Sequence, residues 1–237
     1  MSHPSFPLDR ALRSFRPLAA ALAASLTLLA HTGAQAVALT EPVSPANFAD
    51  TALPGTTVAA RPELAGTVLE DVITAFSFRG ITGTVQNRVV RETASGTLDF
   101  IWKINVDSVE SDVGVVAFRL TDFGYSNLTD ADWRIDGLGS VAPSTARLFN
   151  QAGEPTGSIN FLFDSGVNAG SQSNFFFLHT DATAYSQSAR FDLLGGGEQG
   201  LSPTFSTFAP AVPEPGSYAL ALAGLAVAGL LARLRQA

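Results

Sequence analysis

Residues 98–106 read Leu-Asp-Phe-Ile-Trp-Lys-Ile-Asn-Val, the clearest strand pattern in the chain. The even-numbered positions are all large and apolar, whereas the odd-numbered positions are polar except for Ile101. Successive side chains of a strand point to opposite faces of the sheet, so this alternation predicts a strand that is buried on one face. We therefore expect Phe100 and Trp102 in a core and Asp99 on the opposite face.

The same alternation occurs on both sides of this strand. Apolar residues alternate with other residues at 76–78, 116–120 and 159–163, and clusters of Gly, Asp, Asn and Ser separate these runs. Residues 175–178 are apolar without a break, which suits a strand covered on both faces. No long segment repeats its apolar residues every 3.6 positions. The pattern predicts an all-β fold over residues 66–195, an antiparallel β-sandwich of the jelly-roll or Ig-like class.

Two proline-containing segments border this predicted domain. Residues 37–65 carry several prolines among small residues, which indicates an extended lead-in with an edge strand near Thr56–Ala59. Residues 196–211 contain Pro203 and Pro210 among Ser and Thr, which indicates a linker.

The first 36 residues have the features of a secretory signal peptide. Three arginines precede the apolar run Leu18–Ala30, and Ala34-Gln35-Ala36 fits an A-x-A cleavage site. Signal peptidase and the general secretion machinery are therefore expected partners, and the mature chain would start at Val37.

Composition limits the function further. The chain has no cysteine, which excludes disulfides, thiolate metal sites and a cysteine nucleophile. The leader removes three of the 14 basic residues and one of the 21 acidic residues, so the mature chain keeps 11 and 20, a net charge of −9. An acidic surface argues against nucleic acid, anionic lipid or anionic polysaccharide as electrostatic partners.

The C-terminal segment, residues 212–237, has three parts. Val212-Pro213-Glu214-Pro215 is a rigid elbow, because proline fixes φ and lacks an N–H group. Residues 217–232 favour a helix whose stretch 219–232 carries no polar side chain. Arg233 and Arg235 follow and favour the cytoplasmic side of a membrane. The apolar run of about fourteen residues approaches the roughly twenty that span a bilayer when its flanking residues are added, so it predicts a single transmembrane helix.

This segment closely resembles the PEP-CTERM sorting signal of Gram-negative bacteria, in which a Val-Pro-Glu-Pro motif, a short hydrophobic helix and a basic end follow one another. The resemblance implies processing by an exosortase, a membrane transpeptidase. Residues from about 59 to 190 also look like a domain commonly found ahead of such tails, as in Arg88-Val89-Val90-Arg91 and Gly96-Thr97-Leu98-Asp99-Phe100. That second resemblance implies β structure and carries no catalytic residue.

Few residues suggest chemistry. His179 is the one histidine of the mature chain, and Asp181 could reach it because residues i and i+2 of a strand share a face. No Gly-x-Ser-x-Gly elbow accompanies them, so we expect a structural histidine. Carboxylate pairs such as Glu110 with Asp112 leave a glycosidase open as an alternative.

Two binding sites are further alternatives. Asp130, Asp132 and Asp136 hint at a calcium loop, although the closing Glu of an EF-hand is missing and solvated turn residues are the better interpretation. Trp133 and Tyr125 lie near turns beside aspartates and could stack on sugar rings.

We therefore predict no catalytic residues, no metal site and no cofactor. The chain is expected to pass the inner membrane, to be anchored there transiently and to reach the cell surface or the extracellular space. Its expected role is non-enzymatic, structural or interactive, in exopolysaccharide or biofilm, with no nucleic-acid partner. A secreted carbohydrate-binding module, or a hydrolase of polysaccharides or esters, is the alternative.

Overall fold

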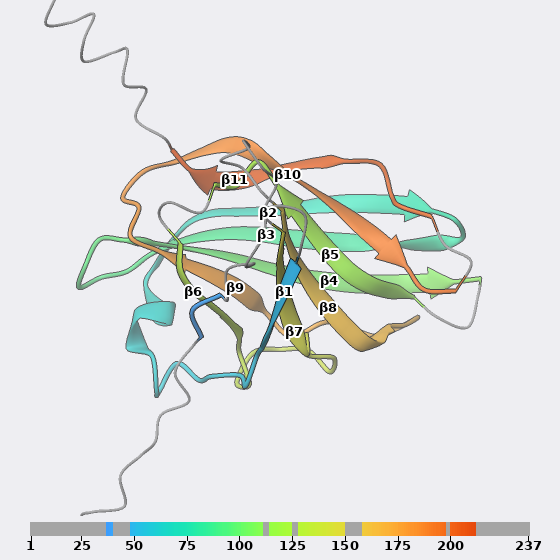
Figure 1. Cartoon of the computed structure of the whole chain (residues 1–237), viewed down its shortest axis with the longest axis horizontal. Coiled ribbons are helices and arrows are strands. Elements are labelled where there is room, and N and C mark those ends of the chain that lie inside the picture. The colour runs from blue at the N-terminus through green and yellow to red at the C-terminus, as the bar shows by residue number, and fades with distance from the viewer. Residues whose placement is uncertain are drawn as a thin grey trace, which may run out of the picture. The chain divides into compact units, whose positions relative to one another are not determined.

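The structure is a computed structural model that describes residues 37–39, 48–110, 114–124, 128–149, 158–197 and 200–211. All of these residues fall within one compact unit (Figure 1). They form antiparallel strands and one turn of 3-10 helix, η1 (Pro62–Ala65). The all-β prediction is confirmed for this part of the chain.

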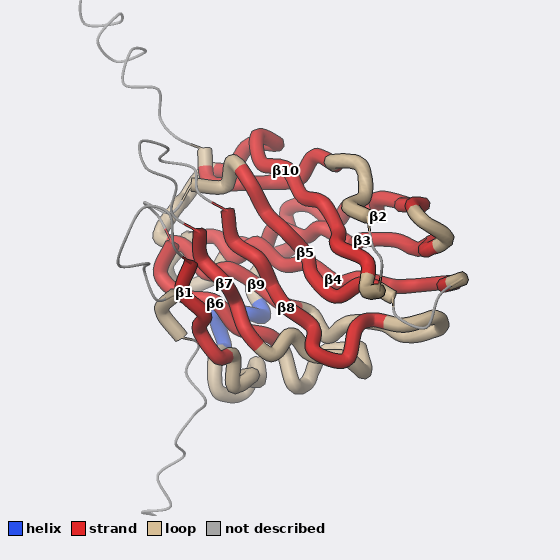
Figure 2. The backbone as a smooth tube through the Cα atoms, turned by 45° about the vertical axis from the view of Figure 1, so that its right-hand side comes forward, coloured by secondary structure: helices blue, strands red, loops and turns tan. Residues whose placement is uncertain are grey.

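The strands form two antiparallel sheets (Figure 2). The five-stranded sheet has the order β2 (Thr67–Phe78), β3 (Ile81–Arg91), β4 (Leu98–Val109), β9 (Phe176–Thr180) and β6 (Leu128–Trp133). The six-stranded sheet has the order β1 (Phe48–Ala52), β7 (Thr145–Phe149), β8 (Ser158–Val167), β5 (Val115–Thr121), β10 (Tyr185–Gly195) and β11 (Phe205–Pro210).

Aromatic residues from both sheets meet in a common core. Trp102 on β4 is 1% exposed, and its ring lies 5.4 Å from that of Phe118 on β5 and 6.1 Å from that of Phe176 on β9. Phe161 on β8 packs 4.7 Å from Phe176, also between ring centroids. Phe100 is fully buried in the same cluster. The expected inward orientation of Phe100 and Trp102 is thus confirmed, and burial of these large apolar surfaces stabilises the pairing of the two sheets.

The opposite face of β4 is covered as well, which differs from the expectation for Asp99. Ile101 on that face belongs to a second, smaller apolar cluster with Leu64 of η1 and Phe177 of β9. Asp99, expected on a solvent-facing side, is fully buried. The reason is that the lead-in folds back over this end of the sheet. The side chains of β4 therefore point alternately into the main core and into the smaller cluster under the lead-in.

The two bordering segments also contribute more structure than their composition suggested. Within the lead-in, the strand lies at β1 and pairs with β7, whereas Thr56 belongs to no strand and forms an isolated bridge to Arg134. Within the expected linker, residues 205–210 form β11, which pairs with β10 and buries Thr207, Phe208 and Ala209. Pro210 is tolerated because it ends an edge strand, where a missing N–H costs little.

No helix in the described part of the chain is long and apolar enough to cross a membrane. The predicted signal peptide (1–36) and the sorting tail (212–237) lie outside the described residues.

Candidate functional site

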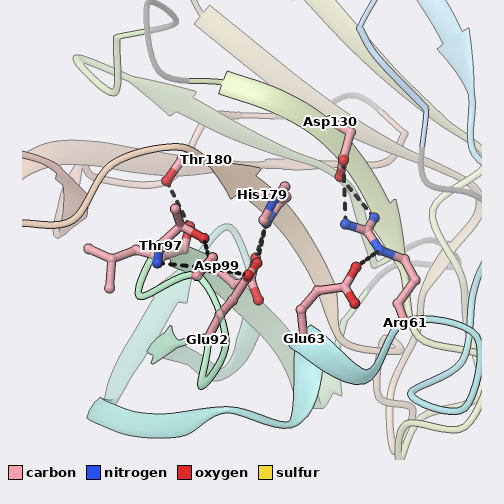
Figure 3. A network of polar contacts seen from close by, with 10 residues as sticks. Arg61, Glu63, Glu92, Thr97, Asp99, Asp130, His179 and Thr180 are labelled. Atoms are coloured by element: carbon pink, nitrogen blue, oxygen red, sulfur yellow. Dashed lines mark hydrogen bonds and ion pairs between the residues drawn. The ribbon is translucent and has the colours of Figure 1, made fainter.

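Glu92, Asp99 and His179 form a buried carboxylate–histidine cluster at one end of the five-stranded sheet (Figure 3). Asp99 on β4 and His179 on β9 are direct partners in the strand register. Glu92 follows β3, in the turn that leads back into β4. This turn is closed by hydrogen bonds from the Glu92 N–H to the Thr97 carbonyl (3.0 Å) and from the Gly96 N–H to the Glu92 carbonyl (3.2 Å). Strand pairing and a tight turn therefore fix all three side chains.

The imidazole of His179 faces both carboxylates through the same nitrogen. Its Nδ1 lies 2.6 Å from Asp99 Oδ1 and 2.9 Å from Glu92 Oε1. The side chains of Asp99 and Glu92 are 0% and 6% exposed, and that of His179 is 17% exposed. The hydrogen bond goes to Asp99, because Glu92 Oε1 makes only the ion-pair contact and has no hydrogen-bond partner among the described residues.

Burial and mutual charge shift the titration of the cluster. Burial raises the pKa of Asp99 to about 6, although the hydrogen bond and charge of His179 act against this rise. Burial alone would lower the pKa of His179, but the hydrogen bond to Asp99 and the charges of Asp99, Asp130 and Glu92 outweigh it, so the pKa of His179 is raised. Both shifts favour protonated forms of the two side chains.

Hydroxyl groups hold the Glu92 carboxylate in place. Ser95 donates its hydroxyl hydrogen to Glu92 Oε2, and the Ser95 and Thr97 hydroxyl oxygens lie 2.6 Å apart. Oε2 is therefore engaged inside the turn, and Oε1 faces the imidazole. Thr180, next to His179, donates its hydroxyl hydrogen to the Leu98 carbonyl (2.7 Å), which ties β9 to β4 beside the cluster.

A second polar group adjoins the cluster (Figure 3). Arg61, 9% exposed, donates to Glu63 Oε1 (2.7 Å) and to Asp130 Oδ1 (2.9 Å), and its guanidinium lies 5.5 Å from the centroid of the Phe177 ring. Asp130 is the register partner of His179 from β6. Two carboxylates thus compensate the charge of Arg61, and the lead-in is fastened over the sheet by this ion pair.

Sequence spacing suggested Asp181 as a possible partner of His179, and the structure shows another carboxylate at its ring. The structure places Asp99 against the imidazole, whereas Asp181 lies exposed in the segment after β9. Pairing of β4 with β9 brings Asp99 and His179 together although they are 80 positions apart in the chain. Of the suggested carboxylate pair, Asp112 lies outside the described residues.

The three aspartates considered for calcium are each engaged separately. Asp130 binds Arg61, as described above. Asp132 Oδ1 accepts the N–H groups of Gly55 (2.8 Å) and Trp133 (2.9 Å). Asp136 accepts the N–H of Val58 (2.8 Å) and the Nε–H of Arg134 (3.1 Å). These contacts attach the lead-in to β6 and to the turn that follows it.

The two aromatic residues considered for sugar binding have different outcomes. Trp133 is half-buried against the core, and its indole N–H donates to the Leu53 carbonyl (3.2 Å). Tyr125 lies outside the described residues. So do the cleavage-site residues and the tail residues: Ala34, Ala36, Val212, Pro213, Glu214, Pro215, Arg233 and Arg235.

Comparison with known proteins bears on this last segment. A family model described as the PEP-CTERM protein-sorting motif matches residues 211–236, which include the Val-Pro-Glu-Pro elbow, the apolar run and both arginines. No curated protein matches the chain. The chain therefore carries a PEP-CTERM sorting motif, which implies export, transient anchoring in the membrane and processing by an exosortase.

Proposed function

We propose that this protein is a non-enzymatic structural or interaction component of the cell surface or extracellular matrix, associated with exopolysaccharide or biofilm. The observation that carries the proposal is the sorting motif at residues 211–236, attached directly to a β domain. The motif directs the chain to the cell surface. A β domain in which both faces of β4 are covered by apolar clusters suits a module that persists outside the cell.

The contacts of the polar groups support a non-enzymatic role. A serine hydrolase needs its histidine positioned between an acid and a hydroxyl nucleophile. Here both carboxylates lie at Nδ1 of His179, the nitrogen that the acid of a triad also uses, and the Ser95 hydroxyl is hydrogen-bonded to Glu92 and so is not placed as the nucleophile. Trp133 uses its indole N–H for a backbone contact, which favours a structural role over stacking on a sugar ring.

The strand order favours the jelly-roll class over the Ig-like class. From β4 to β7 the chain changes sheets at every step. It then returns through β8, which lies between β5 and β7, and β9, which lies between β4 and β6. Because the later strands of each sheet insert between the earlier ones, we propose that the domain is a jelly roll.

Deletion of residues 212–237 tests the address. The cut leaves Ala211, whose N–H donates to the Ala184 carbonyl (2.9 Å), so β11 keeps its pairing. We expect the truncated protein to be a soluble periplasmic or freely secreted domain, whereas the intact chain reaches the cell surface. Surface labelling and fractionation measure this, and equal surface amounts of both forms would overturn the sorting role.

An activity assay tests the non-enzymatic role separately. The exported protein is expected to turn over no ester, peptide or glycan substrate above a boiled control. Reproducible turnover that is lost with His179→Ala would instead favour the hydrolase alternative. Specific retention on a glycan array that is lost with Trp133→Ala would favour the carbohydrate-binding alternative.

A further inference from the structure

We propose that Glu92, Asp99 and His179 form a binding site for one divalent transition-metal ion, with Zn²⁺ as the best match. Their ligand atoms lie within 4.8 Å of one another, and no other group of three such residues in the described part of the chain meets this condition. The proposal goes beyond the sorting function and does not depend on it.

The chemistry of the donors selects the class of ion. One imidazole nitrogen and two carboxylate oxygens are ligands that Zn²⁺ and related ions accept in tetrahedral sites. Calcium and magnesium prefer sites made of oxygen alone, and they take six or more ligands. A water molecule would complete a four-coordinate site here, and the partial exposure of His179 gives solvent a way in.

The geometry is close to what such an ion needs. Two ligands that each lie about 2.0–2.1 Å from a tetrahedral ion are about 3.3 Å apart. The present separations from Nδ1 are 2.6 Å to Asp99 and 2.9 Å to Glu92. Side-chain rotations that open each separation by about 0.4–0.7 Å would admit the ion, because tetrahedral ligands need that spacing. The ion would take the place of the hydrogen bond that now joins Nδ1 and Asp99.

Unpartnered oxygen atoms are an independent observation that points to a ligand. Asp99 Oδ2 and Glu92 Oε1 are buried and have no hydrogen-bond partner among the described residues. Asp99 itself is fully buried, and its carboxylate points into the cluster (Figure 3). A buried carboxylate oxygen that lacks a hydrogen bond is costly, and proteins usually pair such atoms or use them to coordinate a metal.

Charge balance favours the same conclusion. The cluster places two acidic side chains against one imidazole inside the protein. A divalent cation bound by the neutral imidazole would compensate both carboxylates. Arg61 does not supply that charge, because its guanidinium is paired with Glu63 and Asp130.

The surroundings resemble those of a prepared metal site. Metal-binding carboxylates are commonly oriented by a second layer of hydrogen bonds. Ser95 provides such a bond to Glu92 Oε2 and leaves Oε1 facing the imidazole. Asp132 offers a contrast, because it also has an unpartnered buried oxygen but its other oxygen is occupied by two backbone N–H groups. Asp132 therefore caps a backbone segment, and the cluster is the better site for an ion.

The test uses the full-length chain purified in detergent, stripped with EDTA and dialysed against ZnCl₂. Metal content is measured by mass spectrometry, and affinity is measured by calorimetry with ZnCl₂, MgCl₂ and CaCl₂ as separate titrants. We expect one Zn²⁺ per chain, binding at least 10-fold tighter than Mg²⁺ or Ca²⁺, and a melting temperature that rises with Zn²⁺ concentration. Absence of stoichiometric Zn²⁺ binding by the wild-type chain would overturn the proposal.

Variants locate the ion. Glu92→Gln and His179→Gln each keep the side-chain size and should weaken Zn²⁺ binding at least 10-fold, since loss of second-layer groups alone costs about 10–100-fold. Asp71→Asn is the matched control, because Asp71 pairs with Arg88 on β3 and lies outside the cluster. His179→Gln also separates the cluster from His3 and His31. Unchanged binding in both cluster variants, each shown to be folded by near-ultraviolet circular dichroism, would place the ion elsewhere and refute the assignment.

Discussion

Replacing Thr207 with valine tests whether β11 is an integral strand of the sandwich. The Thr207 hydroxyl accepts the indole N–H of Trp102 (3.0 Å) and donates to Asn87 Oδ1 (3.0 Å). All three side chains are at most 2% exposed. This short chain of hydrogen bonds joins β11 to β4 and β3, which belong to the other sheet. It therefore connects the two layers across the core.

The expected cost follows from the groups that the substitution leaves unpaired. Valine has nearly the shape of threonine but no hydroxyl, so the Trp102 N–H and Asn87 Oδ1 both lose their partner inside the core. Each unsatisfied buried group costs about 1–3 kcal/mol. We expect Thr207→Val to lower the free energy of unfolding by about 3 kcal/mol. Thr207→Ser keeps the hydroxyl and removes one methyl group, so it should cost only about 1 kcal/mol.

Urea unfolding of the purified protein, followed by tryptophan fluorescence, measures these differences. Ser206→Ala is the control, because Ser206 is the exposed neighbour on the same strand and its loss should change stability by less than about 0.5 kcal/mol. If Thr207→Val is as stable as wild type, the hydrogen-bonded chain does not hold β11 in the domain. If Thr207→Ser costs as much as Thr207→Val, the methyl group and not the hydroxyl is responsible.

Two further predictions concern the core and pH. Phe100→Ala should lower the free energy of unfolding, measured in urea, by about 3–5 kcal/mol, because it opens a cavity at a fully buried position. Asp107→Ala, at an exposed position of the same strand, should lower it far less. Equal losses in the two variants would reject the assigned register of β4. Burial raises the pKa of Asp132 in the folded protein to about 6 from 3.8, so the folded state binds this proton more tightly than the unfolded state. The stabilising contribution of the Asp132 proton is complete below pH 3.8 and is lost as pH rises through 6. Asp132→Asn keeps an acceptor for the Gly55 and Trp133 N–H groups. It should therefore make the free energy of unfolding less dependent on pH between pH 3.8 and 6, and an unchanged slope there would contradict the raised pKa of Asp132.

The main core could be predicted from sequence because local alternation reports it directly. Leu98, Phe100, Trp102, Ile104 and Val106 share one parity, and all are buried together. The second covered face could not be inferred from β4 alone, since it depends on η1, which lies more than thirty residues earlier in the chain. Ile101 was the one local signal, as an apolar residue among polar positions of the same parity.

The carboxylate–histidine cluster was missed for a related reason. Its members come from a turn, a central strand and a strand 80 positions later, and only the register of β4 with β9 brings them together. Sequence spacing favoured Asp181, because it is near His179 along the chain. The prolines of the expected linker were misleading in the same way, because Pro210 marks the end of β11 and does not mark an unstructured segment.

The short distance between β11 and the sorting motif restricts how the tail can be processed. β11 ends at Pro210, and the matched motif begins at Ala211, which is still hydrogen-bonded to Ala184. Two residue steps separate Ala211 from Pro213, and an extended chain covers at most about 7 Å over them, since each step spans at most ~3.6 Å. An exosortase that binds Pro213-Glu214-Pro215 would therefore meet the surface of the β domain close to β11. The shape of that surface around β11, and not only the motif itself, becomes part of what the enzyme has to accommodate.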